Sequence, residues 1–311
     1  MNQVPSFTSI FQSASYTRSY LMKKYELQSI NNSSEKAYHN SYTFVYYIQI
    51  GHHYFQQGMK SPVPIKPVLL FYGLSHWLKA ALLTVDPDYP ATTHVLAHGL
   101  STRKRKKQGY QFLSDEIRLQ KNGLFPYLSE KLFHVKQLAG DKRTMRQLLF
   151  GLPEMQTIMR VLLKDEGLIH LKRMDNGKFS VTKKDLSQWD GPLSSWVRHL
   201  SHDAKGELTW EETCNEVQLT FLPRPVNDSL SFRTSVDFEL FAPKNRSYII
   251  NLPELLVHYA LLYSLSMICR YEAEWWGELI HSFSADDLPI ITEYLDVSQT
   301  KCPWLLNRLF L

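Results

Sequence analysis

The chain has 311 residues, of which 44% are hydrophobic and 21% charged, a composition that predicts a folded globular protein and excludes a disordered chain. Three cysteines at wide spacing, without a CxxC pair, argue against a disulfide framework and a thiolate metal site. The 35 basic residues exceed the 30 acidic ones by five, the size of one run, Arg103-Lys104-Arg105-Lys106-Lys107, so the basic character is local.

No segment has the pattern of a membrane anchor. Residues 1–20 lack a charged start followed by an apolar core. The longest mainly apolar run, residues 259–269, is shorter than the roughly 20 residues that a membrane-spanning helix needs. We therefore expect a cytoplasmic protein that makes no contact with a membrane.

Two long helices are expected in the first third of the chain. Apolar and aromatic residues recur at helical spacing over residues 33–59, and a Ser-Pro-Val-Pro sequence from Ser61 ends this segment. Residues 66–84 follow as a helix that is apolar on almost all sides, which is typical of a helix in the centre of a bundle. Residues 6–28 are expected to hold one or two further helices.

The middle of the chain has a mixed pattern. Residues 110–118 alternate weakly and precede Asn122-Gly123, which indicates a β-hairpin, and Asp175-Asn176-Gly177 is the strongest hairpin signal in the chain. Short helices are expected at residues 144–150 and 153–163. Further strands are expected at residues 216–222, 230–241 and 248–252.

The chain returns to helix after residue 251. Residues 252–279 predict one long buried helix, and residues 285–311 predict a helix interrupted near Cys302-Pro303. We therefore predict an α+β fold: a mainly helical bundle formed by both chain ends, with an inserted strand-bearing middle region. The expected divisions are residues 1–100, 101–250 and 251–311.

A polar stripe lies on the otherwise apolar helix of residues 66–84. Tyr72, Ser75, His76 and Lys79 are spaced three and four residues apart, so they share one side of the helix. A buried lysine or histidine must be paired or perturbed, which makes Tyr72, His76 and Lys79 candidate ligand-binding residues. The alternative is structural: Lys79 extends to the surface and His76 bonds a carbonyl.

A second candidate is the sequence Arg270-Tyr271-Glu272-Ala273-Glu274-Trp275-Trp276 at the end of the buried helix. Arg270 could pair with a neighbouring glutamate, stack on an indole or bind an anion. We assign Arg270, together with His98, to the candidate ligand-binding residues. Tyr271, Trp275 and Trp276 are expected to hold the fold together.

Neither a metal site nor a cofactor is expected. His94 and His98 are four residues apart, and His199 and His202 three, but no HExxH motif or third ligand accompanies either pair. The chain also lacks a Walker A loop, GxGxxG, GxSxG and the kinase signature set. We therefore assign no catalytic residue.

The basic run of residues 103–107 has two interpretations. Blocks of like charge usually lie on solvated loops, but the run could also contact an anionic partner. Because the rest of the chain is neutral, binding to nucleic acid should be weak at most.

Three motifs together resemble the YaaC-like protein family of Gram-positive bacteria, and the resemblance covers nearly the whole chain. They begin at Lys66 (KPVLLFYGLSH), His98 (HGLS) and Cys269 (CRYEAEWW). The resemblance implies a cytoplasmic bacterial protein and supplies no catalytic residue. In this family the gene often lies beside that for IMP dehydrogenase, which implies a link to purine nucleotide metabolism and makes that enzyme a candidate partner.

The helix around Tyr72 and His76 also resembles HEPN domains, over one or two helices. Nucleases of that kind use an Arg and a His separated by four to six residues. The nearest approaches here are Arg198 to His202 and Arg160 to His170, with three and nine residues between them.

We therefore expect a non-catalytic, regulatory protein that binds a protein partner or an anionic ligand, with homo-oligomer formation left open. The alternative is an RNA-processing or nucleotide-binding enzyme of HEPN-like build that uses His76, Lys79, His98 and Arg270.

Overall fold

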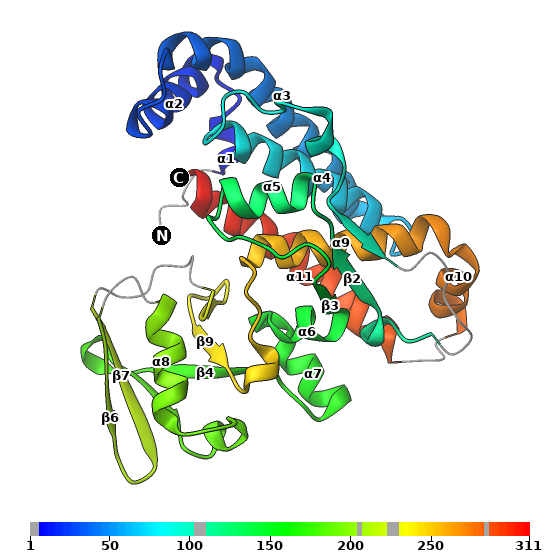
Figure 1. Ribbon diagram of the computed structural model, residues 1–311. Helices are drawn as coiled ribbons and strands as arrows, with labels where there is room; N and C mark the ends of the chain where they lie inside the picture. The colour runs from blue at the N-terminus through cyan, green and yellow to red at the C-terminus, as the bar shows by residue number, and fades with distance from the viewer. Residues whose placement is uncertain (1–5, 103–109, 204–206, 223–229, 283–285) are drawn as a thin grey trace.

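The structure is a computed structural model, and it describes residues 6–102, 110–203, 207–222, 230–282 and 286–311 (Figure 1). It confirms the predicted α+β class, because helices from both chain ends pack together while the middle region carries two antiparallel sheets. The expected divisions at residues 101 and 251 stay a prediction.

The N-terminal part contains the helices predicted from the sequence. These are α1 (Phe7–Ile10), α2 (Ala14–Leu27), α3 (Ser33–Lys60) and α4 (Lys66–Leu83). Two glycines bring α3 and α4 together. A Cβ on Gly51 would lie 2.5 Å from the Trp77 ring, and one on Gly73 would lie 2.9 Å from the Phe55 backbone nitrogen. The two helices therefore approach closely, and α4 packs between α3 and α9.

The C-terminal helices are α9 (Glu254–Tyr271), α10 (Ala273–Ser282) and α11 (Asp287–Phe310). Two details of the prediction are wrong. The expected helix of residues 252–279 breaks at Glu272, whose backbone has φ −120° and ψ 47°, so Trp275 and Trp276 lie on a separate helix. Conversely, α11 continues through Pro303, where the buried neighbours Cys302 and Leu306 hold the helix against the core.

The first sheet is small and lies on the helical part. It has the antiparallel order β1 (Leu100–Thr102), β2 (Glu116–Leu119) and β3 (Lys142–Thr144). The hairpin expected at Asn122-Gly123 is wrong, because Gly123 leads directly into α5 (Leu124–Lys131). Gly123 has φ 122°, and a Cβ there would lie 2.4 Å from the Gly99 backbone. This glycine permits a close backbone contact instead of a turn between strands.

The two short helices expected next are confirmed as α6 (Met145–Phe150) and α7 (Gln156–Leu163). Thr144 and Gln147 form a capping box at the start of α6, since each side chain accepts a hydrogen bond from the other's backbone N–H. Short 3-10 turns occur at Thr93–Leu96, Phe112–Ser114, Pro153–Met155, Asp175–Gly177, Asp185–Gln188 and Arg246–Tyr248.

The second sheet has six antiparallel strands in the order β6-β7-β5-β4-β9-β8. The strands are β4 (Leu168–Arg173), β5 (Phe179–Thr182), β6 (Glu207–Glu212), β7 (Glu216–Leu222), β8 (Arg233–Thr234) and β9 (Leu240–Pro243). The β4–β5 hairpin around Gly177 is confirmed. The expected strand of residues 230–241 divides into β8 and the start of β9, and the strand expected at residues 248–252 is wrong.

Two hydrophobic cores divide the described residues. The first core draws on the helices of both ends and also on the first sheet, α5, α6 and α7. The second core lies between the six-stranded sheet and α8 (Leu193–Asp203), at the lower left of Figure 1. The polar residues predicted to bind a ligand all belong to the part of the chain that surrounds the first core.

Candidate functional site

Four basic side chains from three parts of the chain gather beside the first core. His76 and Lys79 come from α4, His98 precedes β1, and Arg270 lies in the last turn of α9. All four are partly exposed. We call them the cationic cluster.

The α4 end of the cluster lies against tyrosines of α3. Lys79 Nζ is 5.9 Å from the centre of the Tyr47 ring, and the Tyr47 ring is 6.1 Å from the His76 ring. Tyr54 stacks on His76 at 5.6 Å between ring centres. His76 Nδ1 lies 2.8 Å from the Tyr72 carbonyl oxygen, so Nδ1 donates to it and Nε2 is the ring nitrogen left for other contacts.

The α9 end of the cluster is joined to α4 by Tyr72. Arg270 Nη1 is 3.4 Å from the Tyr72 hydroxyl, and the Tyr72 ring is 6.4 Å from the His98 ring. Arg270 Nε donates to the Ser266 carbonyl oxygen at 3.0 Å, which fixes the side chain beside its own helix. The Tyr259 hydroxyl donates to the carbonyl oxygen of His98 at 3.3 Å, which anchors the segment before β1 on α9.

Burial and mutual repulsion disfavour the charged forms of the side chains in the cluster. Burial lowers the pKa of Lys79 and of His76, and the nearby Lys79 ammonium lowers the pKa of His76 further. Burial also lowers the pKa of His98, and the positive charges of Arg270 and Lys79 add to this effect. Among the described residues, no carboxylate forms an ion pair with Lys79, His76, His98 or Arg270. The cluster therefore concentrates positive charge without a counterion from the described part of the chain.

The aromatic rings beside Arg270 are tyrosines and not the tryptophans that were one of its expected alternatives. The Arg270 guanidinium lies 5.2 Å from the Tyr271 ring and 6.0 Å from the Tyr72 ring. Trp276 is buried and donates its indole N–H to the Pro64 carbonyl oxygen at 3.0 Å, whereas Trp275 meets Tyr110 edge to face at 4.6 Å. Tyr271, expected to be structural, has 66% of its surface exposed.

Ser75 is the one member of the polar stripe that is buried. It lies near the hydroxyl of Tyr259 on α9, which also contacts His98. The stripe therefore combines one buried hydroxyl with three partly exposed side chains.

The remaining sequence candidates lie elsewhere. His94 is exposed, and His199 stacks on Trp189. The side chain of His202 and the whole of the basic run 103–107 lie outside the described residues. Within the described residues, no group of three His, Cys, Asp or Glu side chains could hold a metal ion.

Both residues of one Arg–His pair considered for nuclease activity have carboxylate partners. Arg160 pairs with Glu166 at 2.7 Å and His170 with Glu239 at 2.8 Å. In the other pair, Arg198 is exposed on α8.

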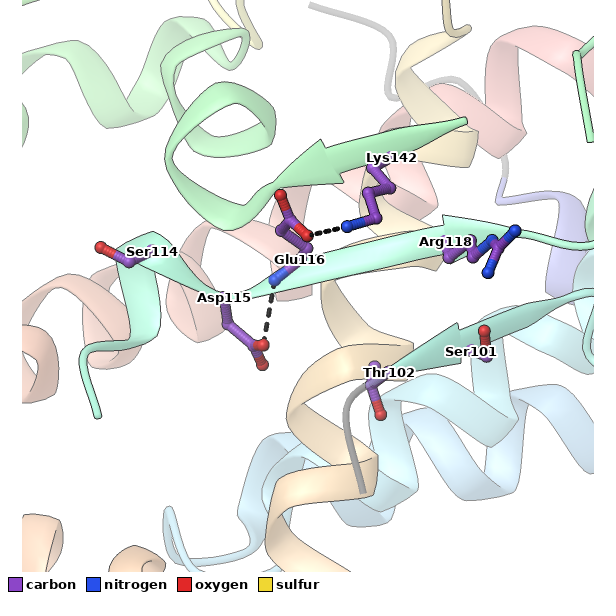
Figure 2. A pocket seen from close by; sticks show the side chains of 7 residues that line it. All are labelled: Ser101, Thr102, Ser114, Asp115, Glu116, Arg118 and Lys142. Carbon is purple, nitrogen blue, oxygen red and sulfur yellow. Dashed lines mark hydrogen bonds and ion pairs between the residues drawn. The ribbon is translucent and has the colours of Figure 1, made fainter. Parts of the chain in front are cut away.

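A surface hollow over the first sheet is a second candidate, and no sequence pattern predicted it. Its volume is about 360 Å³, and it is lined by Ser101, Thr102, Ser114, Asp115, Glu116, Arg118 and Lys142. Figure 2 shows Lys142 of β3 reaching Glu116 of β2, at 2.8 Å. Asp115 accepts hydrogen bonds from the Tyr110 hydroxyl and from the Glu116 backbone N–H. Two acidic and two basic side chains balance one another here, so the hollow does not favour an anion.

A buried group of charges was also missed. Lys301 of α11 is fully buried, and its Nζ lies 2.7 Å from Glu154 Oε1 and 3.2 Å from Glu254 Oε1. Arg233 of β8 is buried beside them and donates to the Leu252 carbonyl oxygen at 2.7 Å. His258 is fully buried on α9, and burial together with the charges of Lys301 and Arg233 lowers its pKa to about 3. We call Glu154, Arg233, Glu254 and Lys301 the buried ion network, with His258 as its uncharged neighbour.

This network connects the two cores. The Lys301 ammonium also donates to the carbonyl oxygen of Thr234 on β8, and Glu154 accepts from the backbone N–H of Val236. One signal could have revealed it: Lys301 shares a side of α11 with the largely apolar side chains of Tyr294, Val297 and Leu305.

Comparison with known proteins agrees with the motifs. The model of the YaaC-like protein family matches residues 9–310. No curated protein and no solved structure shows a significant match to the chain. In the part of the chain that the structure describes, no helix is both long and apolar enough to cross a bilayer. Because the match covers nearly the whole chain, the protein belongs to the YaaC-like family.

Proposed function

We propose that this protein is a non-catalytic cytoplasmic regulator that binds a purine nucleotide at the cationic cluster. The observation that carries the proposal is the convergence of Lys79, His76, His98 and Arg270 without a carboxylate among the described residues. An anionic ligand would neutralise this charge, and lysine and arginine are the usual residues for phosphate.

The tyrosine rings around the cluster favour a ligand that has an aromatic part. Tyr47, Tyr54 and Tyr72 surround the basic groups, and Tyr54 is 38% exposed. Aromatic side chains bind bases by stacking, in a manner that depends little on the base. A ligand with both a phosphate and a base therefore matches the cluster better than a simple anion. The expected link of the family to purine metabolism favours a purine base.

The chemistry of the cluster fits binding more closely than catalysis. Ser75, the hydroxyl nearest to His76 along the helix, is buried. The histidines are crowded by cations that keep them neutral, which weakens them as proton donors at neutral pH. We therefore prefer a binding role over the HEPN-like enzyme.

Isothermal titration with AMP, GMP and IMP tests this proposal, with adenosine and inorganic phosphate as partial ligands. We expect the nucleotides to bind more tightly than either part. Lys79→Met and Arg270→Met should each weaken binding about tenfold or more, because a hydrogen bond to a charged group contributes about 1.5–3 kcal/mol.

Lys142→Met, which alters the hollow in Figure 2, is the matched control and should leave nucleotide affinity unchanged. Equal affinity of the wild-type protein and both cluster variants for every nucleotide would contradict the proposal.

A further inference from the structure

A groove lies between α2 and the end of α11, at the upper left of Figure 1. Its volume is about 510 Å³, within the range of about 300–1,000 Å³ that is usual for small-molecule sites. Apolar and aromatic side chains supply most of its lining: Tyr16, Tyr20 and Leu27 of α2, and Phe310 and Leu311 at the end of α11. We call it the α2 groove.

The α2 groove combines residues held by the first core with residues that remain exposed. The Phe310 ring is 3% exposed and lies 5.5 Å from the ring of the fully buried Phe11. The Tyr20 ring lies 4.8 Å from the same Phe11 ring. Leu27 and Leu311, in contrast, are 74% and 51% exposed. The groove therefore has an aromatic floor fixed by the core, and aliphatic side chains that a ligand can remove from water.

The α2 groove is long and offers few hydrogen-bonding groups. Its lining on α2 begins at Tyr16 and ends at Leu27, and eleven residues of α-helix span about 16 Å. The backbone groups of a helix interior are used within the helix, so they leave few partners for a bound peptide backbone. Ser19, a polar lining residue, donates its hydroxyl to the Ser15 carbonyl oxygen at 3.2 Å. The groove therefore fits an extended hydrocarbon chain better than it fits a peptide.

Two positive charges lie along the same groove. Lys23 and Lys24 belong to its lining, and Lys24 Nζ is 5.3 Å from the centre of the Tyr20 ring. Among the described residues, neither lysine forms an ion pair with a carboxylate. α2 carries three basic residues and one acidic residue, Glu26, which is not part of the lining. The groove is therefore complementary to a ligand that has an anionic head and an apolar chain.

We propose that the α2 groove binds a fatty acid in its carboxylate form. The carboxylate contacts the ammonium groups of Lys23 and Lys24, and the acyl chain lies along α2 toward Tyr16. None of the side chains of the cationic cluster lines this groove. Fatty-acid binding here therefore does not require nucleotide binding at the cluster.

Isothermal titration with octanoate, octanol and acetate tests the class of ligand. Octanoate should bind more tightly than the uncharged octanol or the short acetate. Leu27→Asp should weaken octanoate binding about tenfold or more, because it removes apolar contact and adds a negative charge. Leu138→Asp is the matched control, since Leu138 is 68% exposed outside the groove, and it should bind octanoate like the wild type. The double variant Lys23→Gln/Lys24→Gln should bind octanoate no more tightly than octanol.

Lys79→Met separates the α2 groove from the cationic cluster, and it should leave octanoate affinity unchanged. Octanoate binding that Lys79→Met abolishes and Leu27→Asp does not would overturn the proposal, as would a wild-type protein that binds octanoate no better than acetate.

Cosedimentation with phosphatidylglycerol vesicles distinguishes a free acid from a membrane lipid, and we expect the protein to stay in the supernatant. Vesicle binding that Leu27→Asp abolishes would overturn the proposal in favour of a membrane surface. A dimer in sedimentation equilibrium that Leu27→Asp dissociates would overturn it in favour of a second copy of the chain.

Discussion

The protein contains two groups of charged side chains that differ in whether their charges are paired with opposite charges. In the buried ion network, Lys301 is fully buried between Glu154 and Glu254, so each charge has an opposite neighbour. In the cationic cluster, Lys79 and Arg270 are partly exposed and have no such neighbour among the described residues. Removing a partner from a compensated buried group leaves a buried charge, whereas removing a charge from a repulsive group relieves strain. The comparison therefore separates residues expected to hold the fold from residues that we propose bind a ligand.

The largest expected effect is at Lys301. Lys301→Met leaves Glu154 and Glu254 without their shared cation, so the free energy of unfolding should fall by about 3–5 kcal/mol. Urea denaturation followed by circular dichroism measures the change. Lys79→Met is the matched control. A loss of less than about 1 kcal/mol at Lys301 would show that the buried network is not needed for stability.

The two tryptophans should differ in the same experiment. Trp276→Ala removes a buried ring and its hydrogen bond to Pro64, and it should cost about 3–5 kcal/mol. Trp275 is partly exposed, so Trp275→Ala should cost about 1–2 kcal/mol. Equal losses would mean that the edge-to-face contact with Tyr110 contributes as much as burial of the Trp276 ring.

His258 should make stability depend on pH. Its pKa is lowered from 6.5 to about 3, so between these values the unfolded chain binds a proton that the folded protein does not. Stability from this residue is complete above pH 6.5 and is lost progressively as the pH falls toward 3. Urea midpoints at pH 7 and pH 5 should differ less in His258→Gln than in the wild-type protein. If the urea midpoint changes equally between pH 7 and pH 5 in both proteins, groups other than His258 cause the loss of stability in acid.

The smallest expected stability effect is at the cationic cluster. The lowered pKa of Lys79 means that its charge is unfavourable in the folded protein, so Lys79→Met should change the free energy of unfolding by no more than about 0.5 kcal/mol, or raise it. The measurement is the same urea titration, without nucleotide. A loss comparable with that at Lys301 would make Lys79 a structural residue and would remove the contrast between the two groups.

The sequence predicted helices and hairpins that follow from local patterns. It did not predict contacts between segments that lie far apart in the chain. The long helices α3 and α4 and the hairpin at Gly177 follow from local periodicity and turn residues. Asn122-Gly123 wrongly predicted a hairpin, because Gly123 allows a close backbone contact with Gly99 instead of a turn. Sequence periodicity does not predict such a contact. The break at Glu272 was missed because helix-forming residues lie on both sides of it, so α9 and α10 read as one segment.

The candidate site shows the same division. Tyr72, His76 and Lys79 share one helix face and could be chosen by spacing alone, while His98 and Arg270 were chosen from motifs without knowledge of their neighbours. Tyr47 and Tyr54 lie beside His76 and Tyr72 because α3 packs on α4, which could not be seen in the sequence. The buried ion network draws on residues about 150 positions apart, and no local pattern links Glu154 to Lys301.

Histidine titration by NMR, with and without AMP, tests the central claim most directly, because one sample reports on both groups. Variants His76→Gln, His98→Gln and His258→Gln assign the signals among the 12 histidines. Saturating AMP should raise the lowered pKa values of His76 and His98, because the phosphate offsets the positive charges beside them. His258 should keep its pKa of about 3 in both samples. Unchanged pKa values of His76 and His98 at saturating AMP, or a His258 that titrates near 6.5, would contradict the account.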